Sequence, residues 1–188
     1  MKDNGPAENI YLQLLLEGDE NAYRYFIRTY QNMAYTLALS IVKDNFIAQE
    51  VSQDAFIKAF KGIKKFDWQS TFKTWFYKII VNEAFIRLKK IKKEILIFSE
   101  EYENNIPDES SLSHLHENEQ LEKVNRALLR IPAYESLALR LFYMEDESIK
   151  NICTITGWSV SNTKVILHRA RKNLLLAIQH SNNNNMKF

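Results

Sequence analysis

Apolar side chains recur every three or four residues through the first part of the chain, which is the spacing of one face of an α-helix. The segments with this spacing cover residues about 8–18, 19–43, 46–63 and 71–93. Asp19 and Ser70 stand where N-caps are expected, and Asp44-Asn45 breaks the pattern before the third segment. Because each helix would bury one apolar stripe against its neighbours, we predict a first helical domain over residues 8–94.

The helical spacing is lost over residues 95–114, where Asn, Ser, Pro and acidic residues gather, and we predict a linker there. The spacing resumes at about residue 115, stops at Pro132 and restarts through Leu137. We therefore predict a second helical domain over residues 115–179. A disordered tail is expected over residues 180–188, which include four consecutive asparagines.

The second domain contains the pattern of a helix-turn-helix. Ser148 is predicted to cap a short helix, Gly157 to form a tight turn, and Val160 to begin a longer helix that reaches about Ile178. A short helix, a glycine turn and a longer basic helix form the layout with which many proteins place one helix in the major groove of DNA.

Composition favours helices throughout. Only four Gly and three Pro accompany an apolar content of 46%, which disfavours a β-sandwich, a barrel or a doubly wound sheet. The predicted fold class is all-α, with two small helical domains joined by an acidic flexible linker. The single cysteine, Cys153, cannot form an intrachain disulfide, and the apolar runs are far shorter than the roughly 20 residues that span a bilayer. We expect a cytoplasmic protein without membrane insertion.

The net charge of +2 conceals a strong separation of signs along the chain. Residues 58–93 contain eleven Lys and Arg and two acids, which gives 11 − 2 = +9. Residues 94–122 contain nine acids and no Lys or Arg, and no acid follows Glu147. Solvated helix faces would explain one charge run, but two basic regions divided by an acidic one favour a polyanion contacted at two places.

The longer helix of the helix-turn-helix has an apolar face that includes Thr163, Leu167, Ala170 and Leu174. Its other face is suited to DNA, with base contacts near the helix start and phosphate contacts one or two turns later. The predicted contact residues are Ser159, Ser161, Asn162, Lys164, Val165, His168, Arg169, Arg171 and Lys172. A helical hairpin with a basic face also occurs in proteins that do not bind DNA.

Residues 64–78 interleave aromatic side chains with lysines. Single-stranded nucleic acid is held by bases stacked on aromatic rings beside cations that follow the backbone, and this segment supplies both. Phe72 and Phe76 are predicted to belong to the core. The predicted strand contacts are Lys64, Lys65, Trp68, Lys73, Trp75 and Lys78.

No pattern of a catalytic site is present in the sequence, and we expect a protein that is not an enzyme and needs no cofactor. The four histidines form neither an HExxH nor a Cys/His metal pattern, and there is no phosphate-binding glycine loop or nucleophile elbow. Glu50 and Asp54 lie one turn apart on a predicted helix, but no histidine or third acid joins them. A surface for a protein partner is the better interpretation.

Three separated motifs resemble those of the extracytoplasmic-function sigma factors, over about residues 10–175. The helix from Asn45 to Phe60 resembles the one that grips the clamp helices of the largest polymerase subunit. Residues 66–82 are similar to the promoter-melting and minus-ten segment. Ile131-Pro132 followed by residues 148–175 resembles the domain that reads the minus-thirty-five element.

The resemblance implies roles for particular residues and partners. Contact with core polymerase is assigned to Gln53 and Asp54 with their neighbours Glu50 and Lys58, and Thr74 and Asn82 join the minus-ten contacts. The implied partners are core RNA polymerase through its clamp helices and flap, promoter DNA in duplex and single-stranded form, and an anti-sigma factor. The acidic linker would enter the active-site channel of polymerase as a mimic of nucleic acid.

The chain departs from the family pattern at Ile86 and Ile166, where family members often carry an acid and an arginine respectively. Two other functions remain open at this point. A stand-alone helix-turn-helix regulator would bind duplex DNA without polymerase, usually as a symmetric dimer, and would have little use for residues 64–78. An all-α enzyme acting on phosphates would need a metal cluster, and the sequence contains no pattern for one.

Overall fold

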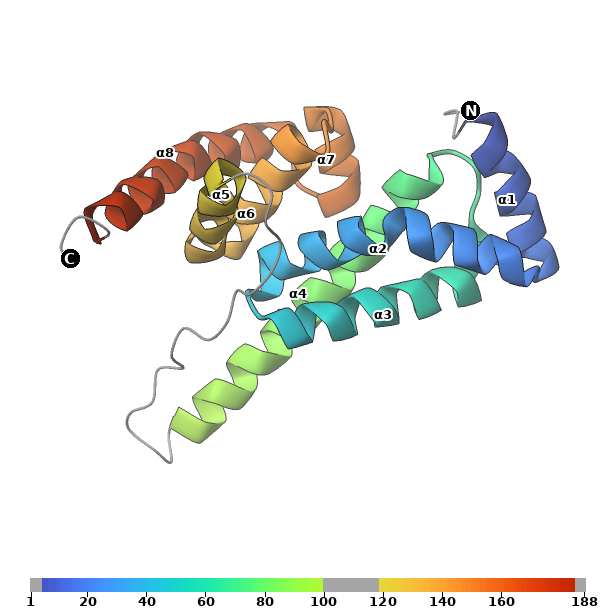
Figure 1. Cartoon of the computed structure of the whole chain (residues 1–188), viewed down its shortest axis with the longest axis horizontal. Coiled ribbons are helices and arrows are strands. Elements are labelled where there is room, and N and C mark those ends of the chain that lie inside the picture. Colours follow the sequence, from blue (N-terminus) through green and yellow to red (C-terminus); the bar gives the residue numbers. More distant parts are fainter. Residues whose placement is uncertain (1–4, 100–118, 185–188) are drawn as a thin grey trace.

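The structure of the chain is a computed structural model that describes residues 5–99 and 119–184 (Figure 1). The described residues contain helices and no β-strand, which confirms the all-α prediction. In chain order the elements are α1 (Pro6–Glu17), α2 (Glu20–Val42), α3 (Asn45–Gly62), the 3₁₀ turn η1 (Ile63–Lys65), α4 (Phe72–Ser99), α5 (Glu119–Arg130), α6 (Ala133–Leu139), the π-helical turn η2 (Arg140–Met144), α7 (Ile149–Thr156) and α8 (Val160–Asn184).

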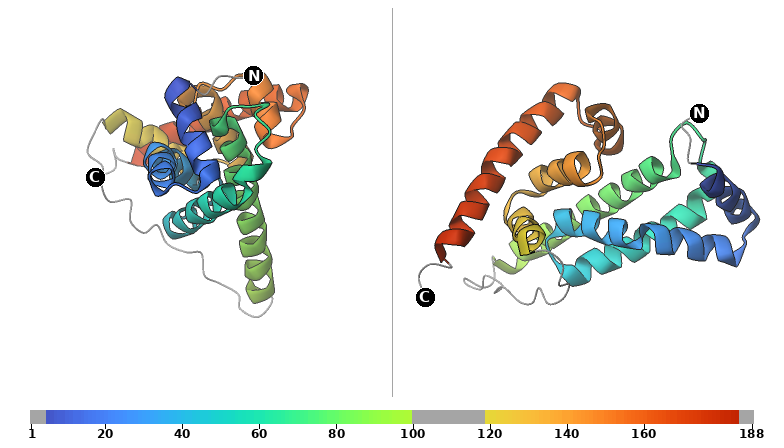
Figure 2. Two further views of the ribbon diagram at one scale, coloured as in Figure 1. Left: turned by 90° about the vertical axis from the view of Figure 1, so that its right-hand side faces the viewer. Right: turned by 45° about the horizontal axis from the view of Figure 1, so that its top comes forward.

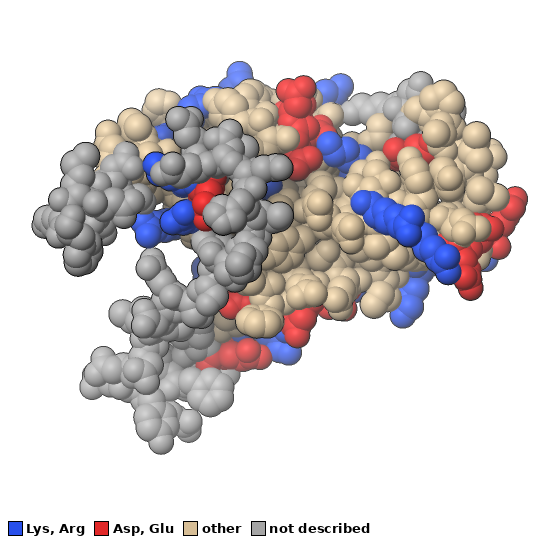
Figure 3. Space-filling view, viewed as in Figure 1, with Lys and Arg blue, Asp and Glu red and all other residues tan. Residues whose placement is uncertain are grey.

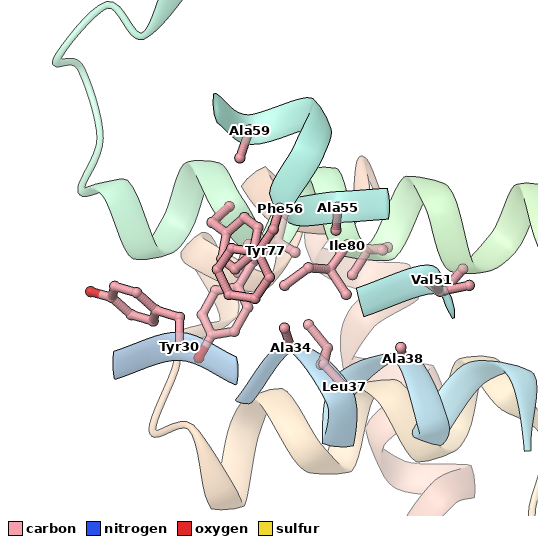
Figure 4. Packing of buried hydrophobic residues seen from close by; sticks show 14 of the residues in the cluster. Tyr30, Ala34, Leu37, Ala38, Val51, Ala55, Phe56, Ala59, Tyr77 and Ile80 are labelled. Carbon is pink, nitrogen blue, oxygen red and sulfur yellow. The ribbon is translucent and has the colours of Figure 1, made fainter. Parts of the chain in front are cut away.

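Helices α2, α3 and α4 form the first domain and pack against one another over their apolar faces. Small residues at the contact, among them Ala34, Ala38 and Ala55, let the helices approach closely, while Phe56 and Ile80 fill the space between them (Figure 4). Such close packing stabilises the domain because it removes apolar surface from water and leaves few voids. Helix α1 covers one end of α2, with Leu12 and Leu15 buried.

The starts of the first-domain helices agree with the sequence at the predicted cap Asp19 and at the predicted break before α3, and differ from it at α4. Asp19 accepts hydrogen bonds from the backbone N–H of Asn21 and Ala22 at the start of α2, and Asp44 accepts from Ile47 N–H at the start of α3. The cap of α4 is Thr71 and not Ser70, because Thr71 Oγ1 accepts from Thr74 N–H at 3.1 Å. The prediction was one residue early at this helix.

The second domain consists of α5 to α8. Pro132 precedes α6 without side-chain capping, Ser148 caps α7 by accepting from Asn151 N–H, and Gly157 ends α7 with φ of +76°. These three breaks confirm the predicted layout of a short helix, a glycine turn and a longer helix. The π-helical turn η2 between α6 and α7 had no signal in the pattern of apolar residues.

The two long helices that end the domains run further than predicted. Helix α4 continues to Ser99, so residues 95–99 of the predicted linker are helical, and Figure 1 shows this end of α4 projecting beyond the bundle. Helix α8 continues to Asn184, into the stretch predicted to be a disordered tail. The rest of the predicted linker, residues 100–114, and the predicted helix start at residues 115–118 lie outside the described residues.

The second domain lies against the side of the first that is formed by α2 and α4 (Figures 1 and 2). Helix α6 contacts α2, and α7 contacts α4. Leu137, Leu141 and Ile152 of the second domain have no exposed surface and belong to the same buried cluster as the core of the first. The apolar core of the first domain therefore extends into the second domain, which also has a smaller buried cluster of its own that includes Leu139, Leu167 and Ala170.

Candidate functional site

Helix α8 presents the residues predicted to contact duplex DNA on one exposed face. Thr163, Leu167 and Ala170 are buried against the second domain, as the helical spacing predicts. Thr163 Oγ1 also donates to Ser159 O at 2.9 Å and lies 3.3 Å from Cys153 Sγ of α7, which fixes the angle between the two helices. All the predicted contacts are exposed: Ser159, Ser161, Asn162, Lys164, Val165, His168, Arg169, Arg171 and Lys172.

Both arginines on this face, Arg169 and Arg171, contact side chains from other helices of the second domain. Arg169 Nη2 lies 3.6 Å from Glu135 Oε1, and the buried Glu135 also accepts from Asn173 Nδ2 at 2.7 Å. Arg171 Nε donates to Tyr143 Oη at 2.8 Å. Both guanidinium groups remain largely exposed on the helix surface, so these contacts orient them and leave donors free for phosphate.

The aromatic and lysine segment, residues 64–78, has a less regular structure. It begins in η1, passes through a loop in which Trp68 has φ of +61°, and enters the first turns of α4. Lys64, Lys65, Lys78 and Asn82 are exposed, as predicted contacts must be. This loop and α4 thus place four of the eight residues predicted to contact the minus-ten strand at the surface.

The remaining four residues are partly or wholly engaged within the protein. Trp68 and Trp75 are half-buried, with ring centroids 5.3 and 5.4 Å from that of Phe66. Lys73 is ion-paired with Glu145 of the second domain at 3.3 Å. Thr74 is only 3% exposed and bonds to Thr71 through its hydroxyl, so the expected DNA contact by Thr74 does not fit the structure. Its burial follows from its place on the face of α4 that it shares with the buried Tyr77 and Val81.

The exposed face of α3 brings together the residues predicted to contact core polymerase. Glu50, Gln53, Asp54 and Lys58 are all exposed along three turns of the helix. Glu50 forms an ion pair with Arg87, and Lys58 with Glu83, which ties this face to α4. Because both pairs lie at the surface, their effect on stability is small and their charges stay accessible to a partner.

A groove between α2 and α3 adjoins this face. Ile27, Tyr35, Phe46 and Gln53 are among the residues that line it. The helical spacing had placed Phe46 in the apolar stripe of the third helical segment, but its side chain is 82% exposed. Phe46 stands in the first turn of α3, and the apolar period alone could not reveal that this turn leaves it uncovered.

Three ionisable side chains lie where the two domains meet, Tyr77 fully buried and Lys43 and Arg140 partly buried. Tyr77 donates to Glu145 Oε2, and burial together with this hydrogen bond raises the pKa of Tyr77. Lys43 Nζ donates to the backbone oxygen of Leu128 at 2.7 Å, and burial lowers the pKa of Lys43 to about 7. Burial also lowers the pKa of Arg140, which stands near Lys43. Their removal from water could not be predicted from the sequence, because it results from the packing of the two domains.

Neither a metal site nor a membrane-spanning helix is found among the described residues. Residues 5–99 and 119–184 contain no group of three or more His, Cys, Asp and Glu side chains able to hold a metal ion. None of the described helices is both long and apolar enough to cross a bilayer. Two of the four histidines, His114 and His116, lie outside the described residues.

The charges of the folded molecule are less segregated than those of the sequence. On the face seen in Figure 3, basic and acidic side chains are interspersed around a broad uncharged area. Acids such as Glu83 and Glu145 pair with lysines of the basic stretch 58–93, and this reduces the positive electrostatic potential around that stretch. Helix α8 is the basic element without any acidic residue of its own, since no acid follows Glu147 in the sequence.

Comparison with known proteins matches both domains to one family. The family model for Sigma-70 region 2 matches residues 26–94, and the model for Sigma-70 region 4 matches residues 121–174. The chain is 32% identical to the RNA polymerase sigma factor SigV of Bacillus subtilis over 148 residues, which cover 77% of this chain and 82% of SigV. It is 29% identical to the ECF RNA polymerase sigma factor SigM of the same organism over 145 residues, or 77% of this chain and 88% of SigM.

Solved structures show the same fold. The sigma factor RpoE of Bartonella quintana, crystallised with the anti-sigma factor NepR, matches with a TM-score of 0.68 and 19% identity over 84% of this chain and 96% of its own. CnrH, solved with the cytosolic domain of CnrY, matches with a TM-score of 0.65 and 17% identity over 93% of this chain and 98% of its own. From the two region matches and the similarity to SigV and SigM, the chain belongs to the extracytoplasmic-function family of RNA polymerase sigma factors.

Proposed function

We propose that this alternative sigma factor acts through three surfaces, one that binds core polymerase and two that bind promoter DNA. The exposed face of α3 docks on the clamp helices of core polymerase, residues 64–82 capture the unpaired minus-ten strand, and the exposed face of α8 holds the minus-thirty-five duplex. The observation that carries this proposal is that all nine residues predicted at the start of α8 and along it, and all four on α3, are exposed, while Leu167 and Ala170 of α8 and Val51 and Ala55 of α3 are buried.

Within the minus-ten surface, Lys64, Lys65, Lys78 and Asn82 are proposed as the principal contacts. Their side chains are exposed, so they can meet phosphates and bases without rearrangement of the core. Trp68 and Trp75 contribute the exposed edges of their rings, because their inner faces pack on Phe66. Thr74 is withdrawn from this set since it is buried.

The action proposed for the chain is binding alone, without catalysis by its own residues, in the cytoplasm where polymerase transcribes. The binding energy of the three surfaces is used to place polymerase on a promoter and to hold separated bases. Since both structural relatives were solved with an anti-sigma factor or a protein domain in complex, we also propose that a protein inhibitor of that class binds this chain. The acidic connector proposed to mimic nucleic acid lies outside the described residues.

The proposal is tested by reconstitution with core polymerase and run-off transcription from a cognate promoter. Asp54→Lys reverses one charge on the exposed face of α3 and should abolish co-purification with core polymerase, together with run-off transcript. Glu17→Lys makes the same charge reversal at an exposed position at the end of α1 and should leave both unchanged. Transcription that is equally strong with Asp54→Lys, or absent with the unmodified chain, contradicts the proposal.

A further inference from the structure

The two arginines on the exposed face of α8, Arg169 and Arg171, are held by partners of different charge. Arg169 Nη2 lies 3.6 Å from Glu135 Oε1, whereas Arg171 Nε donates to Tyr143 Oη at 2.8 Å. A carboxylate compensates the charge of the guanidinium group beside it, but an uncharged phenol leaves that charge in place. Arg171 therefore attracts an anion such as a DNA phosphate more strongly than Arg169 does.

The contact between Arg169 and Glu135 belongs to the packing of α8 on α6. The side chain of Glu135 is only 5% exposed, and its other oxygen accepts from Asn173 Nδ2 at 2.7 Å. Arg169 and Asn173 stand one turn apart on α8, so one carboxylate of α6 holds two consecutive turns of that helix. If Arg169 moved to a phosphate, the buried carboxylate would lose its cation, which is costly where water is largely excluded. Arg169 is thus retained by the protein.

The contact between Arg171 and Tyr143 lies at the surface and is oriented from the protein side. Tyr143 belongs to η2, outside the two helices of the helix-turn-helix, and is 58% exposed. Its ring packs edge-on against Phe142 with centroids 4.9 Å apart, and Arg171 Cζ lies 5.7 Å from the centroid of the Tyr143 ring. These contacts orient both side chains before any DNA arrives, which lowers the entropy lost on binding.

The hydroxyl proton of Tyr143 has no acceptor within the described part of the chain. The hydroxyl oxygen accepts from Arg171, and its own proton makes no hydrogen bond to residues 5–99 or 119–184. A hydroxyl that accepts from a cation is polarised and becomes a stronger donor. This hydroxyl and the remaining N–H groups of Arg171 therefore form a cluster of donors at the surface, which suits the oxygens of a phosphodiester.

The position of this pair on α8 agrees with a DNA strand that runs along one side of the helix. Lys164 stands two turns before Arg171 on the same side of α8, and His168 lies between them. All three side chains are exposed, and α8 contains no acidic residue. Tyr143 extends this row of cations and donors beyond α8, onto η2.

We propose that Tyr143 and Arg171 together form a site for one phosphate of the minus-thirty-five duplex. Arg171 supplies the charge and Tyr143 the hydroxyl donor, while Arg169 serves to attach α8 to α6. The inference rests on the proposed function, because it takes duplex DNA to be the partner of α8. It adds a contact residue from outside the helix-turn-helix, and it separates the roles of two arginines that the sequence pattern treats alike.

The site is tested by binding titrations of the full-length chain with a short duplex that the unmodified chain selects from a random-sequence pool. Arg171→Ala should weaken binding about 5- to 10-fold at low salt and make the slope of log affinity against log salt shallower by about 0.9, the value for one phosphate. Arg169→Ala should leave the slope unaltered. Tyr143→Phe should weaken binding about 3- to 10-fold with an unaltered slope, because an uncharged donor displaces no counterion.

The matched control for the hydroxyl is Tyr134→Phe. Tyr134 is another exposed tyrosine of the second domain, and its ring stacks on Phe85 of the first domain. Removal of its hydroxyl should leave the affinity for the duplex unchanged. Circular dichroism melting should give the same midpoint for Tyr143→Phe as for the unmodified chain, since the ring of Tyr143 and its contact with Phe142 are kept.

The shared phosphate is located by placing an uncharged methylphosphonate at each position of the duplex in turn. At one position the substitution should weaken binding of the unmodified chain and have little further effect on the double variant of Arg171→Ala with Tyr143→Phe, because both contacts are already lost there. Each single variant should be less sensitive than the unmodified chain at that same position. A purely structural role of Tyr143 would not produce this dependence on a single phosphate.

Three results would overturn the site. They are duplex binding by Tyr143→Phe equal to that of the unmodified chain, sensitivity of Tyr143→Phe and Arg171→Ala to different phosphates, and a slope lowered as much by Arg169→Ala as by Arg171→Ala. Absence of duplex binding by the unmodified chain at low salt overturns it as well. Failure of the proposed function has a different signature, in which the unmodified chain does not associate with core polymerase whatever the duplex titrations give.

Discussion

The two predicted DNA surfaces of this sigma factor are built in different ways. On α8 a single regular helix buries Thr163, Leu167 and Ala170 and exposes its polar residues on the opposite side, so the core and the DNA surface use different side chains. In residues 64–78 the chain passes from a 3₁₀ turn through a loop into a helix, and the same tryptophans both close the core and border the surface. A mutation on α8 can therefore change binding alone, whereas one in residues 64–78 often changes folding as well.

The largest effect on folding is expected at Trp75. Its ring packs on Phe66 and Phe72 and lies beside Gly62, where an added Cβ would be 3.8 Å from it. Trp75→Ala should lower the free energy of unfolding by about 2–3 kcal/mol, since it removes a large half-buried ring and leaves a cavity. Urea denaturation measures this loss.

Lys78→Ala provides the comparison within the same segment, because Lys78 is exposed. It should leave the urea midpoint unchanged and reduce promoter opening, monitored by permanganate reactivity of unpaired thymines. If Trp75→Ala leaves the urea midpoint unchanged and impairs only opening, then its ring serves DNA alone and the contrast drawn between the two surfaces fails.

The next largest effect is expected for a double substitution on α8. Arg171→Ala with Lys172→Ala removes two exposed cations and should weaken binding to minus-thirty-five duplex about 10-fold at low salt. The slope of log affinity against log salt should become shallower by about 1–2, as about 0.9 is contributed per phosphate neutralised. Binding titrations at several salt concentrations measure both.

The control removes two exposed arginines from the first domain, with Arg24→Ala and Arg28→Ala on α2. It makes the same change in net charge and should leave the slope for the isolated duplex unaltered. Equal slopes in the unmodified protein and the α8 variant would mean that Arg171 and Lys172 serve the contact with Tyr143 and the solubility of the helix, and not phosphate.

The difference between the surfaces also explains what could be predicted from sequence. Regular helices with one buried face reveal themselves by period, which is why the exposed residues of α8 and the caps Asp19 and Ser148 were predicted correctly. The loop before α4 has no such period, and the first turns of α4 are buried on more than one side, so the burial of Thr74 and the inward faces of Trp68 and Trp75 were missed.

Contacts between the domains were beyond the reach of the sequence for a different reason. The pairing of Tyr77 with Glu145 joins residues 68 positions apart, and that of Lys43 with Leu128 joins residues 85 apart. Local patterns carry no information on such contacts, because their formation depends on how two completed domains dock.

A smaller effect is expected from pH through Lys43, which links the two domains. In the folded chain burial lowers the pKa of Lys43 to about 7, whereas in the unfolded chain it returns towards the ordinary value of 10.5. Between pH 7 and about 9.5 the unfolded state therefore binds more protons, and the free energy of unfolding should rise with pH. The destabilising charge is fully present below pH 7.

The rise should end near pH 10. Burial raises the pKa of Tyr30 and Tyr77, so these tyrosines keep their protons in the folded chain while the unfolded chain loses them, and stability then falls. Thermal melting at pH 7, 8 and 9 measures the rise, which should be flatter for Lys43→Met than for the unmodified chain. Lys64→Met, at an exposed lysine, should keep the full slope, and a slope equal in all three proteins would show that Lys43 does not titrate in this range.

The smallest effects are expected at the glycine that precedes each of the two surfaces. Gly157, before the recognition helix α8, has φ of +76° and no heavy atom within 4 Å of an added Cβ. An alanine side chain at position 157 would therefore meet no neighbouring atom. The expected loss of about 0.5–1 kcal/mol in the free energy of unfolding for Gly157→Ala comes from the left-handed backbone alone.

Gly62, beside Trp75, has φ of −92°, so an alanine there adopts the backbone conformation freely and adds ordinary van der Waals contact with the ring of Trp75. Gly62→Ala should be neutral or slightly stabilising in the same urea titration, and a loss as large as that of Gly157→Ala would mean that Trp75 packs too tightly on α3 to accept one methyl group.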